Sequence, residues 1–299
     1  MDTHTLIIGA GFSGMHIGLH AKRIGEVCGT KRDESTLHEL HKKGLDALAL
    51  SVSDQSSIED VLTDALIQQF HKTSHLVLCV GPSRGEPFSD PILNLLSSAT
   101  VHLPKLRWVG YLSTIGVYGN HDGNWIDETT PCISTQTRSL MRRQSELGWQ
   151  ALAARWQVPL SILRLSGIYG AGRSAVDDAM TGRARMLIKP GQVFNRIHVE
   201  DLAAATVLCA SREYNGVVNI TDDLPAAPQD VIRYAHELVG KPAPVAVDFA
   251  TADISPMARS FYSENKRVNN AMSKQVLGLK YQYPTYKAGL DALWQQFDR

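Results

Sequence analysis

The chain has few cysteines and no excess charge of either sign. Among its 299 residues, 30 basic side chains balance 30 acidic ones, so we expect no nucleic-acid partner. The four cysteines are widely spaced and form no Cys-x-x-Cys pair, which argues against a disulfide framework or a structural zinc site. They are Cys28, Cys79, Cys132 and Cys209.

Long hydrophobic runs are also missing. No apolar stretch reaches the roughly 18 residues of a membrane span, and the first predicted strand starts at residue 5, which leaves no room for a signal peptide. We therefore expect a cytoplasmic protein with no membrane partner. An apolar content of 43% is ordinary for a globular protein, and the length allows one large domain or two moderate ones.

The amino terminus carries a strand that runs into a glycine turn and then into residues at helical spacing. The turn has the pattern Gly-x-Gly-x-x-Gly and reads Gly9-Ala10-Gly11-Phe12-Ser13-Gly14. In a dinucleotide site the first glycine permits the tight turn, the second lets the backbone approach a pyrophosphate, and the third lets helix and strand pack closely. The helix directs its first N–H groups, here those of Phe12 and Ser13, at the phosphates. The alternative is a glycine turn with no ligand.

The second predicted strand indicates which dinucleotide binds. An NAD site usually has a carboxylate at the end of this strand, but the strand here ends with Thr30, Lys31 and Arg32. A hydroxyl and two cations suit a 2′-phosphate, so we predict NADP(H) as cofactor, with NAD(H) less favoured. The alternative is that Lys31 and Arg32 belong to a solvated loop.

Strands and helices alternate along the first two thirds of the chain. This pattern predicts an α/β fold, a Rossmann-type doubly wound parallel sheet with a smaller carboxy-terminal substrate lid. We assign residues 1–169 and 197–220 to the NAD(P)-binding domain, and 170–196 and 221–299 to the lid. Strands are predicted at 5–9, 26–30, 46–50, 75–80, 106–112, 160–165 and 217–220, and helices at 12–22, 33–42, 57–70, 90–100, 139–156, 197–211, 227–239 and 266–277.

Ligands of such sheets gather at the carboxyl ends of the strands. Val80 at the end of the fourth strand and Gly81 directly after it are therefore expected beside the cofactor. Asp54, after the third strand, either reaches the adenine edge or caps the following helix, and capping is the default for an Asp in this context.

Four ordered landmarks together resemble the extended short-chain dehydrogenase/reductase superfamily, specifically its NAD(P)-dependent epimerase/dehydratase-like members. They are the glycine turn, Tyr111–Gly119, Arg164–Gly170 and Ile197–Ala203. Extended members usually carry Gly-x-x-Gly-x-x-Gly, whose first glycine would fall at position 8. Ile8 stands there instead, so the resemblance is to an atypical member.

The resemblance implies a catalytic trio of Ser or Thr, Tyr and Lys. Thr114 matches the hydroxyl position, and Ser113 beside it is implied in cofactor binding. Counting back from Glu146, Arg138 stands in place of Tyr and Arg142 in place of Lys. Arg142 can still bond ribose hydroxyls, but Arg138 cannot exchange a proton, because a guanidinium stays charged.

Another group would then have to supply the proton. The candidates are Thr114, Tyr118, His121, Tyr169 and His198. Tyr118 more often packs beneath the loop in this motif. The ordinary pKa of a histidine suits proton transfer at His198, although a lone histidine is more often structural.

The Gly- and Arg-rich segment 170–196 is where the resemblance implies contacts to substrate phosphates. We predict Arg173 and Arg196 as substrate-binding residues; the alternative is a solvated charged loop. The partner is then a small-molecule substrate, and a homodimer through the helix carrying Arg142 is common in similar proteins. We expect an oxidoreductase or epimerase/dehydratase-like enzyme on a small anionic or nucleotide-linked carbonyl or alcohol, with a non-catalytic NADP(H) sensor as the alternative.

Overall fold

The computed structural model describes residues 3–83 and 87–297, which form two compact units. Unit 1 comprises residues 1–117, 135–164 and 202–218, and unit 2 comprises 118–134, 165–201 and 219–299. Within the described residues, no helix has both the length and the apolar character needed to cross a bilayer.

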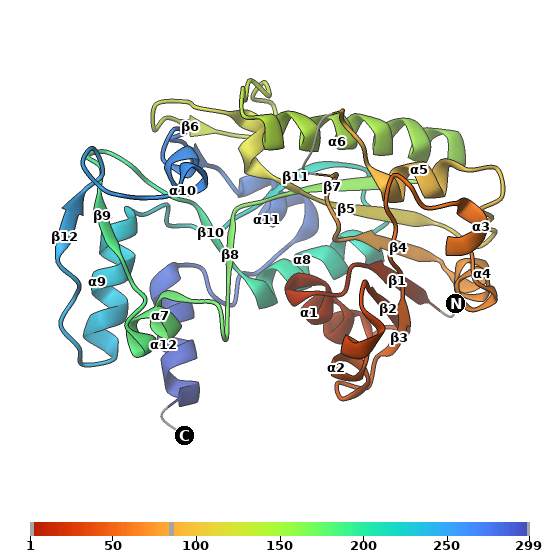
Figure 1. Cartoon of the computed structure of the whole chain (residues 1–299), viewed down its shortest axis with the longest axis horizontal. Helices are drawn as coiled ribbons and strands as arrows, with labels where there is room; N and C mark the ends of the chain where they lie inside the picture. Colours follow the sequence, from red (N-terminus) through yellow and green to blue (C-terminus); the bar gives the residue numbers. More distant parts are fainter. Residues whose placement is uncertain (1–2, 84–86, 298–299) are drawn as a thin grey trace. The chain divides into compact units, whose positions relative to one another are not determined.

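Unit 1 contains most of a seven-stranded sheet (Figure 1). In spatial order its strands are β11 (Gly216–Ile220), β7 (Leu160–Leu165), β5 (Trp108–Thr114), β4 (His75–Leu78), β1 (His4–Ile8), β2 (Glu26–Lys31) and β3 (Asp46–Ala49). Strands β1, β2, β3, β4 and β5 pair in parallel. The order reverses between β1 and β4, where ligands bind in doubly wound sheets. The predicted α/β fold with a parallel sheet is confirmed.

The sheet strands are nearly continuous apolar runs because helices cover both faces. Figure 1 shows α5 and α6 along one face and α1 and α8 along the other. The helices that lie wholly or mostly in unit 1 are α1 (Phe12–Ala21), α2 (His38–His41), α3 (Ile58–Val61), α4 (Asp64–Lys72), α5 (Pro91–Ser97), α6 (Thr137–Trp156) and α8 (Val199–Ser211). The core between sheet, α4, α5 and α6 includes Phe70, Tyr111 and Trp149.

Two predicted helices of unit 1 are each divided. The expected helix 57–70 is α3 followed by α4, because Ser57 and Thr63 each accept a hydrogen bond from the backbone three residues on and start a separate helix. The expected helix 33–42 is a 3₁₀ turn, Glu34–Thr36, capped by Asp33, followed by the single-turn α2.

Unit 2 combines short parallel strand pairs with helices. The pairs are β8 (Gly167–Tyr169) with β10 (Arg196–His198), β9 (Met186–Ile188) with β12 (Ala246–Asp248), and β6 (Trp125–Ile126) with β13 (Arg267–Val268). Its helices are α7 (Ala175–Thr181), α9 (Pro228–Leu238), α10 (Pro256–Phe261), α11 (Ala271–Leu277) and α12 (Tyr286–Phe297). Helices α7, α9 and α12 enclose a second core that includes Val176, Ala235 and Leu290.

The sequence prediction was less accurate in unit 2. The expected helix 266–277 begins with β13 and becomes helical at Ala271, and the expected helix 197–211 begins with the last residues of β10. Helix α12 was not predicted, although Thr285 accepts a hydrogen bond from the N–H of Ala288 in its first turn, a recognisable cap.

Candidate functional site

The glycine turn joins β1 to α1 in a conformation that glycine permits. Gly9 has φ +89°, and a Cβ there would lie 2.5 Å from Cγ2 of Val80. A Cβ on Gly14 would lie 2.7 Å from the carbonyl oxygen of Gly9. These two glycines therefore let the turn, the start of α1 and the segment after β4 pack against one another.

Gly11 differs from both neighbours in the motif. Its φ is −77°, and a Cβ built on it would meet no described atom within 4 Å. Packing within the described protein therefore does not explain glycine here. The open space lies at the start of the ten-residue helix α1, at the end where a helix presents its first backbone N–H groups. A pyrophosphate fits such a cradle, because it accepts from these N–H groups and needs backbone without a Cβ.

Thr30 at the end of β2 supports the turn from beneath. Its hydroxyl oxygen accepts from the N–H of Gly9 at 3.0 Å, its carbonyl accepts from the N–H of Ala10 at 2.7 Å, and its side chain is buried. The hydroxyl predicted to bind a 2′-phosphate is thus enclosed and serves the glycine turn instead.

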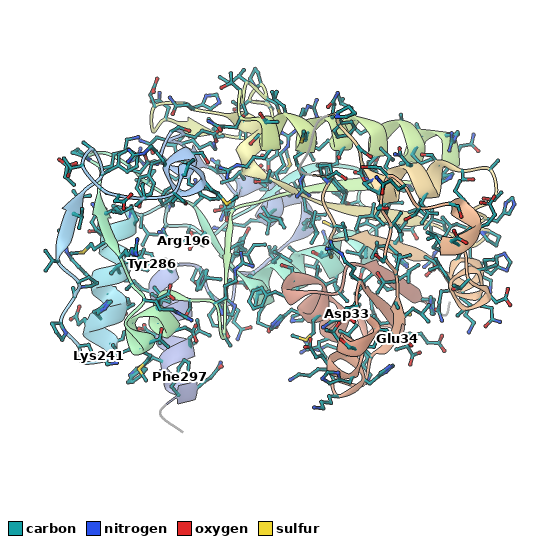
Figure 2. All side chains as sticks on the ribbon, in the orientation of Figure 1. Asp33, Glu34, Arg196, Lys241, Tyr286 and Phe297 are labelled. Carbon is teal, nitrogen blue, oxygen red and sulfur yellow. The ribbon has the colours of Figure 1, made fainter. Side chains whose placement is uncertain are left out.

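The two cations after Thr30 differ in their surroundings. Lys31 forms an ion pair with Glu39 of α2. Arg32 is exposed and has no hydrogen bond or ion pair with the described residues. In Figure 2 the labelled Asp33 and Glu34 mark the adjoining 3₁₀ turn, whose cap is Asp33.

Asp54 does not cap the next helix, contrary to the default expectation. Ser57 caps α3, while the Asp54 carboxylate accepts hydrogen bonds from the hydroxyls of Ser83 and Ser89. Asp54 therefore ties the segment after β3 to the segment after β4. Its proposed contact with the adenine edge stays a prediction.

Arg142 of α6 reaches the ends of β4 and β5. A Cβ on Gly81 would lie 2.4 Å from one terminal guanidinium nitrogen, so the guanidinium rests on the Gly81 backbone. Arg142 Nη1 donates to the carbonyl of Leu112 at 2.9 Å and to the hydroxyl of Tyr111 at 3.4 Å. Gly81 and Arg142, both predicted as cofactor-binding, are thus brought together, and Tyr111 is a partner of Arg142 that the sequence did not reveal.

Thr114 ends β5 and is half-buried. Its hydroxyl oxygen accepts from the N–H of Gly116 at 3.1 Å, and a Cβ on Gly116 would lie 2.9 Å from Oγ of Ser139. The buried side chain of α6 beside this turn is thus Ser139, whereas Arg138 is exposed. Ser139 was not expected at this turn, since a serine within a helix carries no distinctive signal.

Ser113 faces a buried network rather than an open site. Its hydroxyl donates to the carboxylate of Glu146 at 2.6 Å, and that carboxylate also accepts from Arg164 through two nitrogens, at 2.8 and 3.1 Å, and from Arg143 at 2.7 Å. Burial raises the pKa of Glu146, but the hydrogen bonds and charge of Arg164 outweigh it and leave the pKa below its ordinary value. The side chain of Ser113, predicted to bind cofactor, therefore anchors β5 to α6 and β7.

Tyr118 and His198 are both enclosed within unit 2. Tyr118 has no exposed surface, and its hydroxyl donates to Oδ1 of Asn219 at 2.8 Å. The ring of His198 lies between those of Tyr169 and Tyr283, with centroids 5.1 and 4.0 Å away, and Nδ1 accepts from the N–H of Glu200. These contacts give both side chains a packing role, which was the alternative interpretation for each.

Two other candidate proton donors also lie in unit 2. His121 Nε2 bonds the carbonyl oxygen of Tyr118 at 3.1 Å. Tyr169 is buried, and burial raises the pKa of its hydroxyl far above the ordinary value. The environment of Tyr169 therefore does not favour proton exchange near neutral pH.

The two arginines predicted to bind substrate have different environments. Arg173 is exposed in the turn before α7. Arg196 donates from Nη1 to the carbonyls of Phe194 and Ala226, at 3.0 and 3.2 Å, and burial lowers its pKa. Figure 2 shows Arg196 and Tyr286 among the side chains that fill unit 2.

Asp222 in the same unit was not singled out by the sequence. The residue is 1% exposed, its Oδ1 accepts from the N–H of Leu224, and its Oδ2 has no hydrogen-bond partner among the described residues. Burial raises its pKa to about 7, although the Leu224 hydrogen bond and the charge of Arg196 act in the opposite direction.

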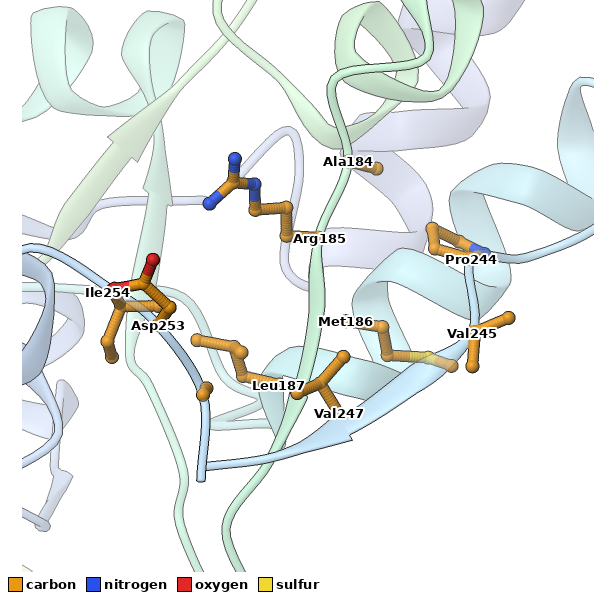
Figure 3. Close-up of a pocket in the computed structure, with 10 residues that line it drawn as sticks. Ala184, Arg185, Met186, Leu187, Pro244, Val245, Val247, Asp253 and Ile254 are labelled. Atoms are coloured by element: carbon orange, nitrogen blue, oxygen red, sulfur yellow. The ribbon is translucent and has the colours of Figure 1, made fainter. Parts of the chain in front are cut away.

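A pocket of about 300 Å³ lies on the β9–β12 pair of unit 2 (Figure 3). Arg185 and Asp253 supply charged groups to a lining that is otherwise apolar, made of Ala184, Met186, Leu187, Pro244, Val245, Val247, Ala252 and Ile254. Its volume is at the lower end of the range for small-molecule sites.

One solved structure is similar to this chain in both sequence and fold. A protein from Silicibacter pomeroyi, described as conserved and of unknown function, is 40% identical over the full length of both chains, with a TM-score of 0.85. The chain belongs to the same family as this protein. No family model matches, and no curated protein does.

More distant solved structures identify the fold. The dTDP-glucose 4,6-dehydratase of Bacillus anthracis, in complex with NAD, is 17% identical over 99% of this chain and 97% of that chain, with a TM-score of 0.76. The UDP-glucuronic acid 4-epimerase of Bacillus cereus, also in complex with NAD, is 17% identical over 99% and 100%, with a TM-score of 0.73. The predicted resemblance to the extended short-chain dehydrogenase/reductase fold is confirmed.

Proposed function

We propose that this chain binds a nicotinamide dinucleotide on the glycine turn and is an NADP(H)-dependent oxidoreductase. The observation that carries the proposal is the open space at Gly11, where the fold leaves room for a Cβ that the residue does not have. Two structures of the same fold are named as complexes with NAD, which supports a nicotinamide cofactor here.

NADP(H) is favoured over NAD(H) by Arg32. This exposed guanidinium follows β2 directly and has no partner among the described residues, so it is available to a 2′-phosphate. Lys31 contributes less, because Glu39 neutralises it.

Fluorescence titrations with NADPH and NADH test this choice. We expect NADPH to bind more tightly and R32Q to lose most of that difference, while R23Q, which removes an exposed cation beyond the other end of α1, keeps it. Equal affinities for the two coenzymes, or tighter NADH binding, would contradict the preference.

For turnover, the bound coenzyme supplies or accepts a hydride. Thr114 is the side chain best placed to orient a substrate oxygen, because its hydroxyl accepts from Gly116 and keeps its own hydrogen to donate. The substrate we propose is a small anionic or nucleotide-linked carbonyl or alcohol, in keeping with exposed cations such as Arg173 and Arg185 of unit 2.

The assay follows NADPH oxidation across a panel of simple and nucleotide-linked carbonyl compounds. T114A should suppress turnover, whereas T114S, which keeps the hydroxyl, should retain it. Turnover that survives T114A unchanged would remove Thr114 from the chemistry.

A second function, a non-catalytic NADP(H) sensor, is favoured by one observation. Arg138 and Arg142 occupy the positions that the resemblance implies for Tyr and Lys. Tyr118, a candidate to supply the missing phenol, is fully buried. Cofactor binding without turnover of any compound in the panel would favour the sensor.

A further inference from the structure

Two side-chain hydroxyls converge on Gly116, in the 3₁₀ turn Ile115–Tyr118 that follows β5. A Cβ on Gly116 would lie 2.9 Å from Oγ of Ser139 and 3.3 Å from Oγ1 of Thr114. Glycine leaves this position empty, so both hydroxyl oxygens lie close to one point with no side chain between them. Thr114 comes from the end of β5 and Ser139 from the first turn of α6. Two separate elements of unit 1 thus bring their hydroxyls to the same turn.

The hydroxyl of Ser139 is buried without a partner. Ser139 is 3% exposed, and within residues 3–83 and 87–297 its hydroxyl makes no hydrogen bond. A serine in a helix commonly faces solvent or bonds the carbonyl four residues back, and Ser139 does neither. Because an unsatisfied buried hydroxyl destabilises a fold, a polar group that is bound only at work accounts for it.

The hydroxyl of Thr114 is engaged only as an acceptor. Its oxygen accepts from the N–H of Gly116 at 3.1 Å, and a hydroxyl that accepts keeps its own hydrogen for another partner. Ser139 supplies a second hydrogen beside it. A carbonyl oxygen has two lone pairs, so it suits a pair of O–H donors.

The start of α6 favours an acceptor that gains negative charge. Ser139 is the third residue of this 20-residue helix, and no acidic residue stands in its first turn. The positive end of a helix dipole lies at the first turn. An oxygen bound by Ser139 is therefore stabilised further when it becomes anionic.

We propose that Ser139 is a second catalytic hydrogen-bond donor, which acts beside Thr114 on the substrate oxygen in place of the phenol that the chain lacks. The inference rests on the oxidoreductase function proposed above. As the substrate carbonyl carbon accepts a hydride, the reduced coenzyme is oxidised and the π electron pair moves onto the carbonyl oxygen. That oxygen then takes a proton from water. The two hydroxyls stabilise the charged oxygen and keep their own protons, so neither has to titrate near neutral pH.

Steady-state kinetics of coenzyme oxidation test the proposal, with a carbonyl compound that the native chain reduces. S139A should lower kcat about a hundredfold and leave KM and coenzyme affinity nearly unchanged, because the lost bond is strongest in the transition state. S139C, which fills the same space but donates weakly, should lower kcat nearly as far. S145A removes another buried serine hydroxyl further along α6 and should keep the native kcat.

A double substitution tests whether the hydroxyl itself is responsible. G116A should also lower kcat, since its Cβ would displace Oγ of Ser139 from 2.9 Å. In S139A that oxygen is gone, so S139A/G116A should have the same kcat as S139A.

The outcomes separate this role from the proposed function. If the native chain reduces no compound of the panel, the oxidoreductase function fails, and the role of Ser139 fails with it. If the native chain turns over but S139A keeps its kcat, only the role of Ser139 is overturned. Additive losses in S139A/G116A, or a native kcat in S139C, would overturn it as well. Equal melting temperatures of S139C and S145A would show that the loss of kcat does not come from unfolding.

Discussion

Replacing Asp222 by Asn should change how the stability of the protein depends on pH. The folded protein holds the Asp222 proton up to a pKa of about 7, whereas the ordinary pKa of an aspartate side chain is 3.8. Stability from this raised pKa is fully present below 3.8 and is lost as pH rises through 7. Three pKa units correspond to about 4 kcal/mol, at about 1.36 kcal/mol each, so the native chain should lose up to about 4 kcal/mol from this group.

D222N has no proton to lose, so it should avoid that cost. Urea unfolding at pH 4 to 8, followed by circular dichroism, gives the free energy of unfolding of both proteins. The stability of D222N relative to the native chain should rise across this range, most steeply between pH 4 and 7. Groups that titrate equally in both proteins do not contribute to the difference between their free energies of unfolding. A difference that stays flat would show that Asp222 ionises normally and that its enclosure is misjudged.

Three further substitutions test separate parts of the structure. E146Q should cost about 3–5 kcal/mol in the free energy of unfolding, because it leaves the buried Arg164 without its carboxylate. The cost should shrink as pH falls through the lowered pKa of Glu146, which urea unfolding at several pH values would show. Y118F should cost about 1–3 kcal/mol by leaving Oδ1 of Asn219 without its donor, and should leave coenzyme affinity unchanged; a loss of affinity by titration would give Tyr118 a direct role. G9A should destabilise the fold by about 1–3 kcal/mol and weaken coenzyme binding, since φ is +89° there; unchanged melting and binding would contradict the strained turn.

The parallel sheet could be predicted because buried strands such as His75–Leu78 are short apolar runs between helical patterns. The division of 57–70 into two helices also had a local signal, since Ser57 and Thr63 each precede acidic residues at a helix start. The helical spacing of the apolar residues instead favoured one continuous helix over 57–70. The short strand pairs of unit 2, such as β9 with β12, join distant segments and have no local signature.

The candidate site likewise has features that local sequence predicts and features that depend on distant contacts. The glycine turn follows from local sequence, because the residue types needed are adjacent in the chain. The enclosure of Thr30 and Ser113 depends on contacts with Gly9 and Glu146, which lie 21 and 33 residues away. The anchoring of Arg142 by Tyr111 likewise depends on how α6 crosses β5.

In the function proposed here, the main chain around Gly11 cradles the pyrophosphate of a nicotinamide dinucleotide. Isothermal calorimetry with NADPH on the native chain and on G11V tests it most directly. We expect saturable binding to the native chain and its loss in G11V, with melting little changed because the added side chain would start in open space. Absence of heat with both reduced and oxidised coenzymes on the folded native chain, or full binding by G11V, would contradict it.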